Sequence, residues 1–120
     1  MKNQISIGID VGGSHISCAA YDLEKNQLIP KSISHISLNN QGTRDEIINA
    51  FTLLIQTCFA KVEFDQLRGI GIAMPGPFDY VNGVGLFTGE NAKFQKLNEV
   101  NLRSAIQNSL EINDLPIRFI

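Results

Sequence analysis

The chain has 120 residues, of which 43% are hydrophobic and 18% are charged, and its formal net charge is -2. This length corresponds to one domain with a core of its own, and the composition is that of an ordinary globular protein. The small negative charge gives no electrostatic reason to expect nucleic acid or a membrane surface as a partner. The sequence has no apolar run of membrane-spanning length and no room for a secretion signal before the first strand, so we expect a cytoplasmic protein.

The N-terminal stretch predicts two strands, 5–10 and 16–22, joined by a glycine turn behind a single acid, Asp10. The turn reads Gly-Gly-Ser at 12–14. Glycine lets the backbone approach an anion closely, and successive free N–H groups in such a turn can donate to phosphate oxygens. Asp10 would meet a phosphate only through Mg²⁺ or water, because like charges repel. An ordinary hairpin turn explains the same glycines, so both interpretations stay open on this motif alone.

The next segment predicts a third strand and then a long helix. Residues 27–37 form the strand, and Pro30 places its beginning at a sheet edge or a bulge. Over 44–62 the apolar residues recur at helical spacing, and Thr43 followed by acidic residues is a typical helix start. We therefore expect a helix of about five turns with one face in the core.

The second half of the chain predicts two further strands and one more helix. Residues 67–74 form a buried strand entered from the first helix, which indicates a parallel crossover, and the loop Pro75-Gly-Pro-Phe-Asp79 then turns sharply out. Residues 98–110 predict a second amphipathic helix, and 117–120 begin another buried strand. The order β-β-β-α-β-α-β describes a mixed sheet with helices packed on it. Because the sequence stops inside this last strand, we expect a piece of a longer protein.

The cysteines and histidines are far apart and have no metal-ligand spacing. We expect Cys18 and Cys58 to be reduced core residues, because free cysteine is commonly buried. We expect His15 and His35 to be strand residues rather than metal ligands.

Three stretches resemble the ROK family of repressors and sugar kinases, within the actin and hexokinase superfamily. Residues 8–14 (Gly-Ile-Asp-Val-Gly-Gly-Ser) look like its first phosphate motif, and 69–79, with Gly83 beyond, look like the glycine-rich strand and Pro-Gly-Pro loop that line its sugar cleft. Asn91 and 97–102 look like the segment before the helix that precedes the catalytic strand. The resemblance covers nearly the whole chain and implies a ribonuclease-H-like, five-stranded mixed sheet.

This resemblance implies an ATP-dependent kinase that phosphorylates a hexose or an N-acylated amino-sugar. Its phosphate and Mg²⁺ site would use Asp10, Gly12, Gly13 and Ser14. Asp10 would act through water or Mg²⁺, whereas the other three would meet the β- and γ-phosphates. Gly76 and Asn91 would contact sugar hydroxyls, so the glycine turn and the Pro-Gly-Pro loop should border one crevice. The segment Thr88-Gly-Glu departs from the usual family pattern and leaves the choice of sugar open.

In the family the catalytic base is the Asp of an Asn-Asp pair just after the strand that here begins at Pro116. The resemblance therefore implies that residues 1–120 are one N-terminal domain with no catalytic residue, inactive alone, and that an adenosine-binding domain follows. A homodimer of the full-length protein is compatible with it. Two alternatives stay open: a sugar-sensing repressor of the same family, and a non-enzymatic actin-like nucleotide-binding domain, against which the Pro-Gly-Pro loop argues.

Overall fold

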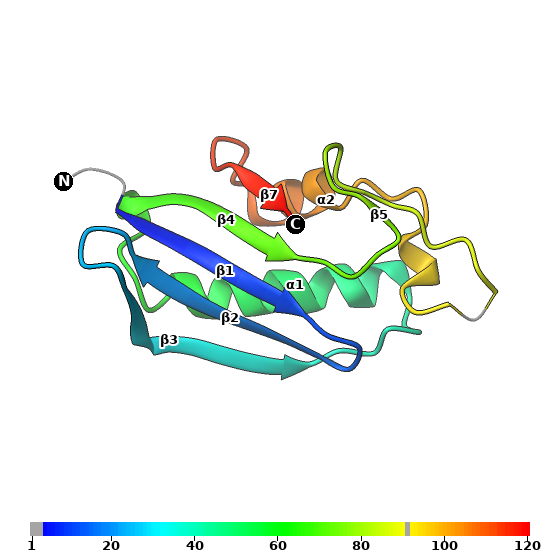
Figure 1. Cartoon of the computed structure of the whole chain (residues 1–120), viewed down its shortest axis with the longest axis horizontal. Helices are drawn as coiled ribbons and strands as arrows, with labels where there is room; N and C mark the ends of the chain where they lie inside the picture. The colour runs from blue at the N-terminus through cyan, green and yellow to red at the C-terminus, as the bar shows by residue number, and fades with distance from the viewer. Residues whose placement is uncertain (1–3, 91) are drawn as a thin grey trace.

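The computed structural model describes residues 4–90 and 92–120. Five strands form one mixed sheet in the order β3-β2-β1-β4-β7 (Figure 1). They are β1 (Ile5–Val11), β2 (His15–Asp22), β3 (Gln27–Ser37), β4 (Leu67–Ala73) and β7 (Ile117–Phe119). The strands β1, β2 and β3 pair antiparallel, whereas β4 is parallel to both β1 and β7. The predicted order of the five strands of this sheet and of the two helices, and the parallel crossover, are confirmed.

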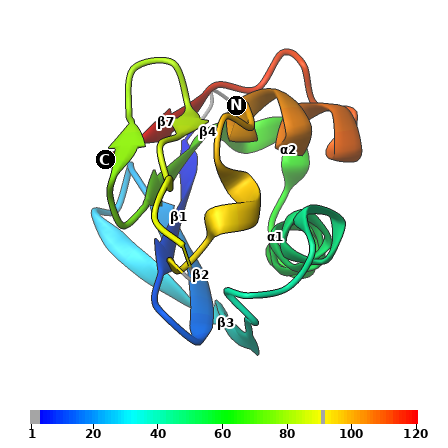
Figure 2. The same cartoon turned by 90° about the vertical axis from the view of Figure 1, so that its right-hand side faces the viewer.

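Two helices, α1 (Arg44–Phe59) and α2 (Leu102–Leu110), lie on the same side of this sheet (Figure 2). Alternation along the strands explains this arrangement, because successive side chains point to opposite faces. In β1, Ile7 and Ile9 are buried while Gly8 and Asp10 between and after them are exposed. The helices contribute fully buried side chains such as Phe51 to the same core. In the described part of the chain, no helix covers the opposite face.

Strand β3 lies at the sheet edge and is irregular where Pro30 lies, as predicted. Its register against β2 shifts between Cys18 and Ala20. The buried Ser32 hydroxyl accepts a hydrogen bond from the Ala20 amide at 2.7 Å and donates to the Ile29 carbonyl at 2.6 Å. A side chain thus satisfies the amide that the irregular strand leaves without a backbone acceptor.

Helix α1 begins as predicted but ends at Phe59 rather than at Val62. Thr43 and Glu46 form a capping box at its start. After Ala60 the amides bond three residues back instead of four, with Lys61 donating to the Cys58 carbonyl at 3.0 Å. Val62 fits the helical spacing of apolar residues in the sequence, but it packs on the core from this turn and not from the helix.

The prediction that the second helix starts at residue 98 is wrong, since α2 begins at Leu102. Residues 98 to 101 lie against a hairpin that the sequence did not indicate, β5 (Phe78–Asp79) with β6 (Val84–Gly85). Asn101 caps the helix, because its side chain accepts the Ser104 amide at 3.0 Å. Asparagine favours such caps over helix interiors, and this preference outweighs the apolar spacing of the segment.

The cysteine and histidine predictions are confirmed for position. Cys18 and Cys58 are free and buried, and the hydrogen bond with Cys18, followed by burial, raises the pKa of the Cys58 thiol. His15 lies in β2 and His35 in β3. Among the described helices, none combines the length and apolar character needed to cross a membrane.

Candidate functional site

The predicted residues Gly12, Gly13 and Ser14 follow the carboxyl end of β1, and Gly76 follows that of β4. These strands are parallel neighbours, with Asp10 opposite Ala73, so the turn at 12–14 and the loop at 74–77 leave the sheet at the same edge. Ligands of open α/β sheets commonly bind outside this edge. The turn is also tied to the end of β3, because the Leu38 amide donates to the Ser14 carbonyl at 2.8 Å.

The glycine turn presents backbone donors. The Gly12 amide donates to the His15 carbonyl at 2.9 Å, which closes the turn. Within residues 4–90 and 92–120, the amides of Gly13 and Ser14 donate to no acceptor. A side chain would also crowd the turn, because a Cβ atom on Gly12 would lie 3.2 Å from the His15 carbonyl oxygen. Two free neighbouring amides on a glycine turn are chemically suited to bind an anion.

The glycine turn and the Pro-Gly-Pro loop border one crevice of about 240 Å³. Gly12 and Gly13 line one side of it, and Pro75 and Gly76 line the other. The structure therefore brings together the predicted phosphate turn and the predicted sugar wall. The crevice is further lined by Val11, Phe87, Lys93 and Phe94.

Of the other predicted site residues, Asp10 and Ser14 are not among those that line the crevice. Asp10 is exposed on the face of the sheet that carries no helix, where it borders a separate hollow of about 490 Å³. The Ser14 hydroxyl lies 2.9 Å from Nδ1 of His15 and is exposed. Asn91 lies outside the described residues. The crevice thus combines three of the predicted residues, and Asp10 reaches the same edge from the neighbouring face.

A short loop between β3 and α1 holds the crevice together. The Asn40 side chain donates to the Gly13 carbonyl, and the Asn40 carbonyl accepts the Phe94 amide at 3.0 Å. Gln41 Nε2 donates to the Ala92 carbonyl at 3.4 Å. One loop therefore connects the glycine turn to the segment that carries Lys93.

Aromatic side chains support the crevice from below. Phe87 and Phe94 are buried with ring centroids 5.7 Å apart, and Phe78 packs on Phe87 at 6.3 Å. The Tyr80 hydroxyl donates to the Met74 carbonyl at 2.7 Å, which fixes the loop that carries Gly76. This wall is consequently part of the hydrophobic core.

Asp79, at the end of the Pro-Gly-Pro loop, stabilises a local turn through its carboxylate. Its carboxylate accepts the Asn82 side-chain amide at 2.8 Å and the Asn82 backbone amide at 3.1 Å. These two hydrogen bonds, the side-chain one first, hold the pKa of Asp79 below its ordinary value. Its carboxylate therefore organises the loop between β5 and β6.

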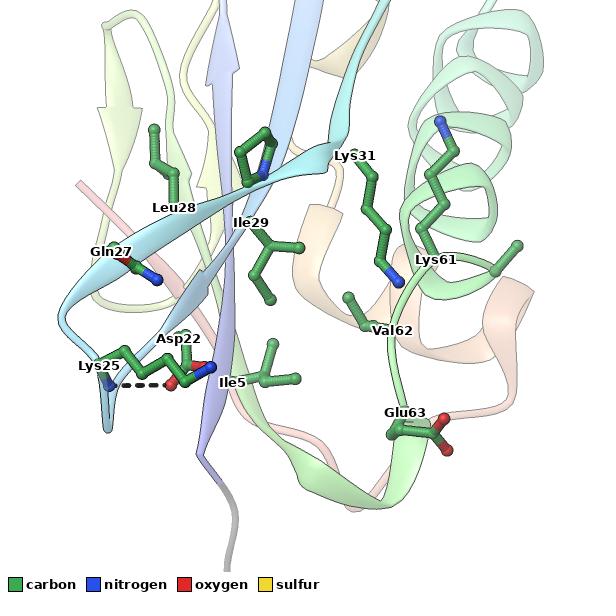
Figure 3. Close-up of a pocket in the computed structure, with 12 residues that line it drawn as sticks. Ile5, Asp22, Lys25, Gln27, Leu28, Ile29, Lys31, Lys61, Val62 and Glu63 are labelled. Atoms are coloured by element: carbon green, nitrogen blue, oxygen red, sulfur yellow. Dashed lines mark hydrogen bonds between the residues drawn. The ribbon is translucent and has the colours of Figure 1, made fainter.

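A larger hollow of about 470 Å³ lies between the start of β3 and the end of α1 (Figure 3). Asp22, one of its two acids, is engaged in a local turn, because Oδ1 accepts the amides of Glu24 and Lys25 at 3.0 and 3.1 Å. Lys31 points toward Val62, whereas the ammonium group of Lys61 points away along the helix. None of the sequence-predicted site residues lines this hollow.

Sequence reasoning missed Lys93, Asn40 and the two buried phenylalanines of the crevice. The segment 86–94 contains no helical or strand periodicity, and Asn40 lies in a polar loop that looked like a simple break between elements. A lysine between an alanine and a phenylalanine gives no local signal of its own. Only the three-dimensional contact with Gly13 makes it visible.

The fold is that of a ribonuclease-H-like α/β domain with a five-stranded mixed sheet. A family model described as "ROK family" matches residues 6–118, and the chain belongs to that family. Among curated proteins, none matches the chain.

Solved structures share the fold at low sequence identity. A ROK family glucokinase from Streptomyces griseus, in complex with glucose and AMPPNP, is 20% identical with a TM-score of 0.71, over 96% of this chain and 32% of that one. An inorganic polyphosphate/ATP-glucomannokinase from Arthrobacter is 21% identical with a TM-score of 0.72, over 98% and 44%.

A ROK family transcriptional regulator, described as a homologue of the E. coli MLC protein, is 17% identical with a TM-score of 0.73. That match covers 98% of this chain and 27% of the regulator. The chain spans about a third of the ROK hexokinase from Thermus thermophilus and of the two glucokinases that it resembles. Both kinases and a regulator therefore share this domain.

Proposed function

We propose that this chain is the N-terminal part of an ATP-dependent kinase whose substrate is a hexose or an N-acyl hexosamine. The observation that carries the proposal is the single crevice bordered by the glycine turn and by Gly76. The free amides of Gly13 and Ser14 fit phosphate oxygens, and the exposed Asp10 carboxylate fits Mg²⁺ held through water. The likeness to ATP- and polyphosphate-dependent sugar kinases supports it.

In this proposal the chain positions the reactants and the rest of the protein completes the reaction. The amides of Gly13 and Ser14 orient the donor's phosphates, while Gly76 and Asn91 orient the sugar. Mg²⁺ would supply charge neutralisation on the phosphates when bound. The sugar hydroxyl oxygen attacks the terminal phosphorus, the bond to the bridging oxygen breaks, and ADP leaves. The hydroxyl proton passes to a carboxylate that we place just after Ile120.

The regulator among the similar structures supports a second candidate, a sugar-sensing repressor. Both candidates bind sugar in the crevice, but only the kinase consumes ATP. A cytoplasmic location follows from either candidate and agrees with two free cysteines, since reducing compartments keep thiols reduced.

The test is sugar-dependent ADP release by the full-length protein over a panel of hexoses and hexosamines. We expect turnover with at least one sugar and a loss of about a hundredfold or more in Asp10→Ala, because Mg²⁺ and phosphate positioning fail together. Asp114→Ala is the matched control, since Asp114 is an exposed acid outside the crevice. Circular dichroism would check that both variants are folded.

Unchanged turnover in Asp10→Ala would refute the phosphate site. Sugar binding without ATP consumption would favour the repressor. We expect residues 1–120 alone to show no turnover, and ATP consumption by that piece would refute our placement of the base.

A further inference from the structure

We propose that Lys93 is a phosphate-binding residue, whose ammonium group binds the terminal phosphate of the donor above the glycine turn. The inference rests on the proposed function and adds to it a positive charge that the sequence motifs did not indicate. It concerns the same crevice.

The position of the lysine is the first argument. A Cβ atom on Gly13 would lie 3.0 Å from Nζ of Lys93, so the ammonium group sits directly against the glycine that carries a free amide. Lys93 also lines the crevice together with Pro75 and Gly76. It therefore contacts the space between the phosphate turn and the proposed sugar wall, where the transferred group must pass.

The charge of the lysine is the second argument. Among the residues that the structure describes, Lys93 forms no ion pair, and the ion pair found there joins Arg44 and Asp45 at 3.8 Å on the surface. The ammonium group and the two free amides are neighbouring hydrogen-bond donors, and no carboxylate is paired with the ammonium group. They can therefore bind an anionic acceptor. Phosphate oxygens supply such acceptors, and lysine binds them as a compact point charge.

The third argument is that the backbone on both sides of Lys93 is fixed. The Ala92 carbonyl accepts Gln41 Nε2 at 3.4 Å, and the Phe94 amide donates to the Asn40 carbonyl at 3.0 Å. Asn40 in turn donates to the Gly13 carbonyl.

Phe94 is 1% exposed and adopts a left-handed backbone with φ of 62°, which a bulky residue adopts only when its surroundings hold it there. The core therefore anchors Phe94 and leaves the lysine before it free to reach into the crevice.

The role follows from the chemistry of phosphoryl transfer. Negative charge is spread over the terminal phosphate oxygens in the transition state, and a positioned cation neutralises it. A lysine between the two walls of the crevice is suited to that phosphate, whereas the amides of Gly13 and Ser14 are suited to the adjoining one. Lys93 would thus bind the phosphate on the sugar side of the crevice, next to the phosphate that the glycine turn binds.

The experiment titrates inorganic tripolyphosphate with equimolar Mg²⁺ into the ¹⁵N-labelled chain and follows the amides of Gly13 and Ser14 by NMR. Both amides should shift in the wild type. Lys93→Met should weaken binding by about tenfold, as expected for the loss of one hydrogen bond to a charged group. Lys93→Arg should bind within about threefold of the wild type, because it keeps the charge. Lys96→Met is the matched control, since Lys96 is exposed nearby but does not line the crevice.

The outcomes separate this inference from the proposed function. Equal affinity of Lys93→Met and Lys96→Met, with the Gly13 and Ser14 shifts intact, would overturn the role of Lys93 and leave the phosphate turn standing. Absence of those shifts in the wild type would overturn both. An unaltered amide spectrum away from the crevice would show that each variant is folded.

Discussion

Gly85 shows how a single residue fixes the wall of the crevice. It is buried in β6, and a Cβ atom there would overlap the Leu97 carbonyl oxygen and lie 3.0 Å from the Phe87 ring. Its amide donates to the Val100 carbonyl at 3.2 Å and its carbonyl accepts the Glu99 amide at 2.9 Å. The glycine thus lets the segment before α2 pack against the hairpin with no side chain between them.

We therefore expect Gly85→Ala to lower the free energy of unfolding by about 3 kcal/mol, because the clash is with backbone that cannot move aside. Gly71→Ala is the control, since nothing lies within 4 Å of a Cβ atom at Gly71. That variant should stay within about 1 kcal/mol of the wild type. Urea unfolding of both variants measures the difference. Equal midpoints would show that the hairpin accommodates the Cβ atom at position 85 with no loss of stability.

The two helices differ in how well the sequence predicts where they begin. The start of α1 was predictable because Thr43 and Glu46 bond each other's backbone within four residues of sequence. The start of α2 was not, because Asn98 to Asn101 pair with β6 through contacts that bring distant parts of the chain together. The short strands β5 and β6 escaped prediction for the same reason, since two residues each carry no period.

The capping box of α1 should have a measurable effect on stability. Thr43 Oγ1 accepts the Glu46 amide at 3.1 Å, and Glu46 Oε1 accepts the Thr43 amide at 2.8 Å. Thr43→Ala removes one of these bonds and should lower the free energy of unfolding by about 1 kcal/mol. Thr57→Ala is the control, because Thr57 bonds only the Leu53 carbonyl inside the same helix. Thermal unfolding compares the two, and a larger loss in Thr57→Ala would contradict the capping argument.

For the whole molecule, the sequence predicted the sheet, the helices on it and the meeting of the glycine turn with Gly76. The sheet and its helices follow from the periodicity of the apolar residues. The meeting of the glycine turn with Gly76 was instead implied by the resemblance to the ROK family. It did not predict Lys93 or the Asn40 loop, because their places depend on how the segment after Phe87 folds back over the turn. Periodicity locates elements, whereas irregular segments are placed by tertiary contacts alone.

One face of the sheet carries no helix in the described part of the chain (Figure 2). All-parallel sheets are normally covered on both faces, and the strands β1, β4 and β7 of this mixed sheet run parallel. Here Leu28 is 51% exposed, Ile33 43% and Ile120 79%, around a hollow of about 490 Å³. Gly8 and Gly71 leave open space between them. This face therefore presents apolar side chains around a shallow depression in the described part of the chain.

We expect the 120-residue chain to bind a hydrophobic dye at this face and to associate at high concentration, since contiguous exposed apolar surface favours both. Ile33→Lys should reduce dye fluorescence and association without a loss of thermal stability, because the side chain is already partly in water. Val81→Lys is the control, since Val81 is 83% exposed in the loop between β5 and β6 and lies away from this face. Fluorescence titration and sedimentation measure the two effects. If Val81→Lys reduced both as much as Ile33→Lys, the dye and the self-contacts would lie elsewhere, and the bare sheet face would have no special affinity for apolar partners.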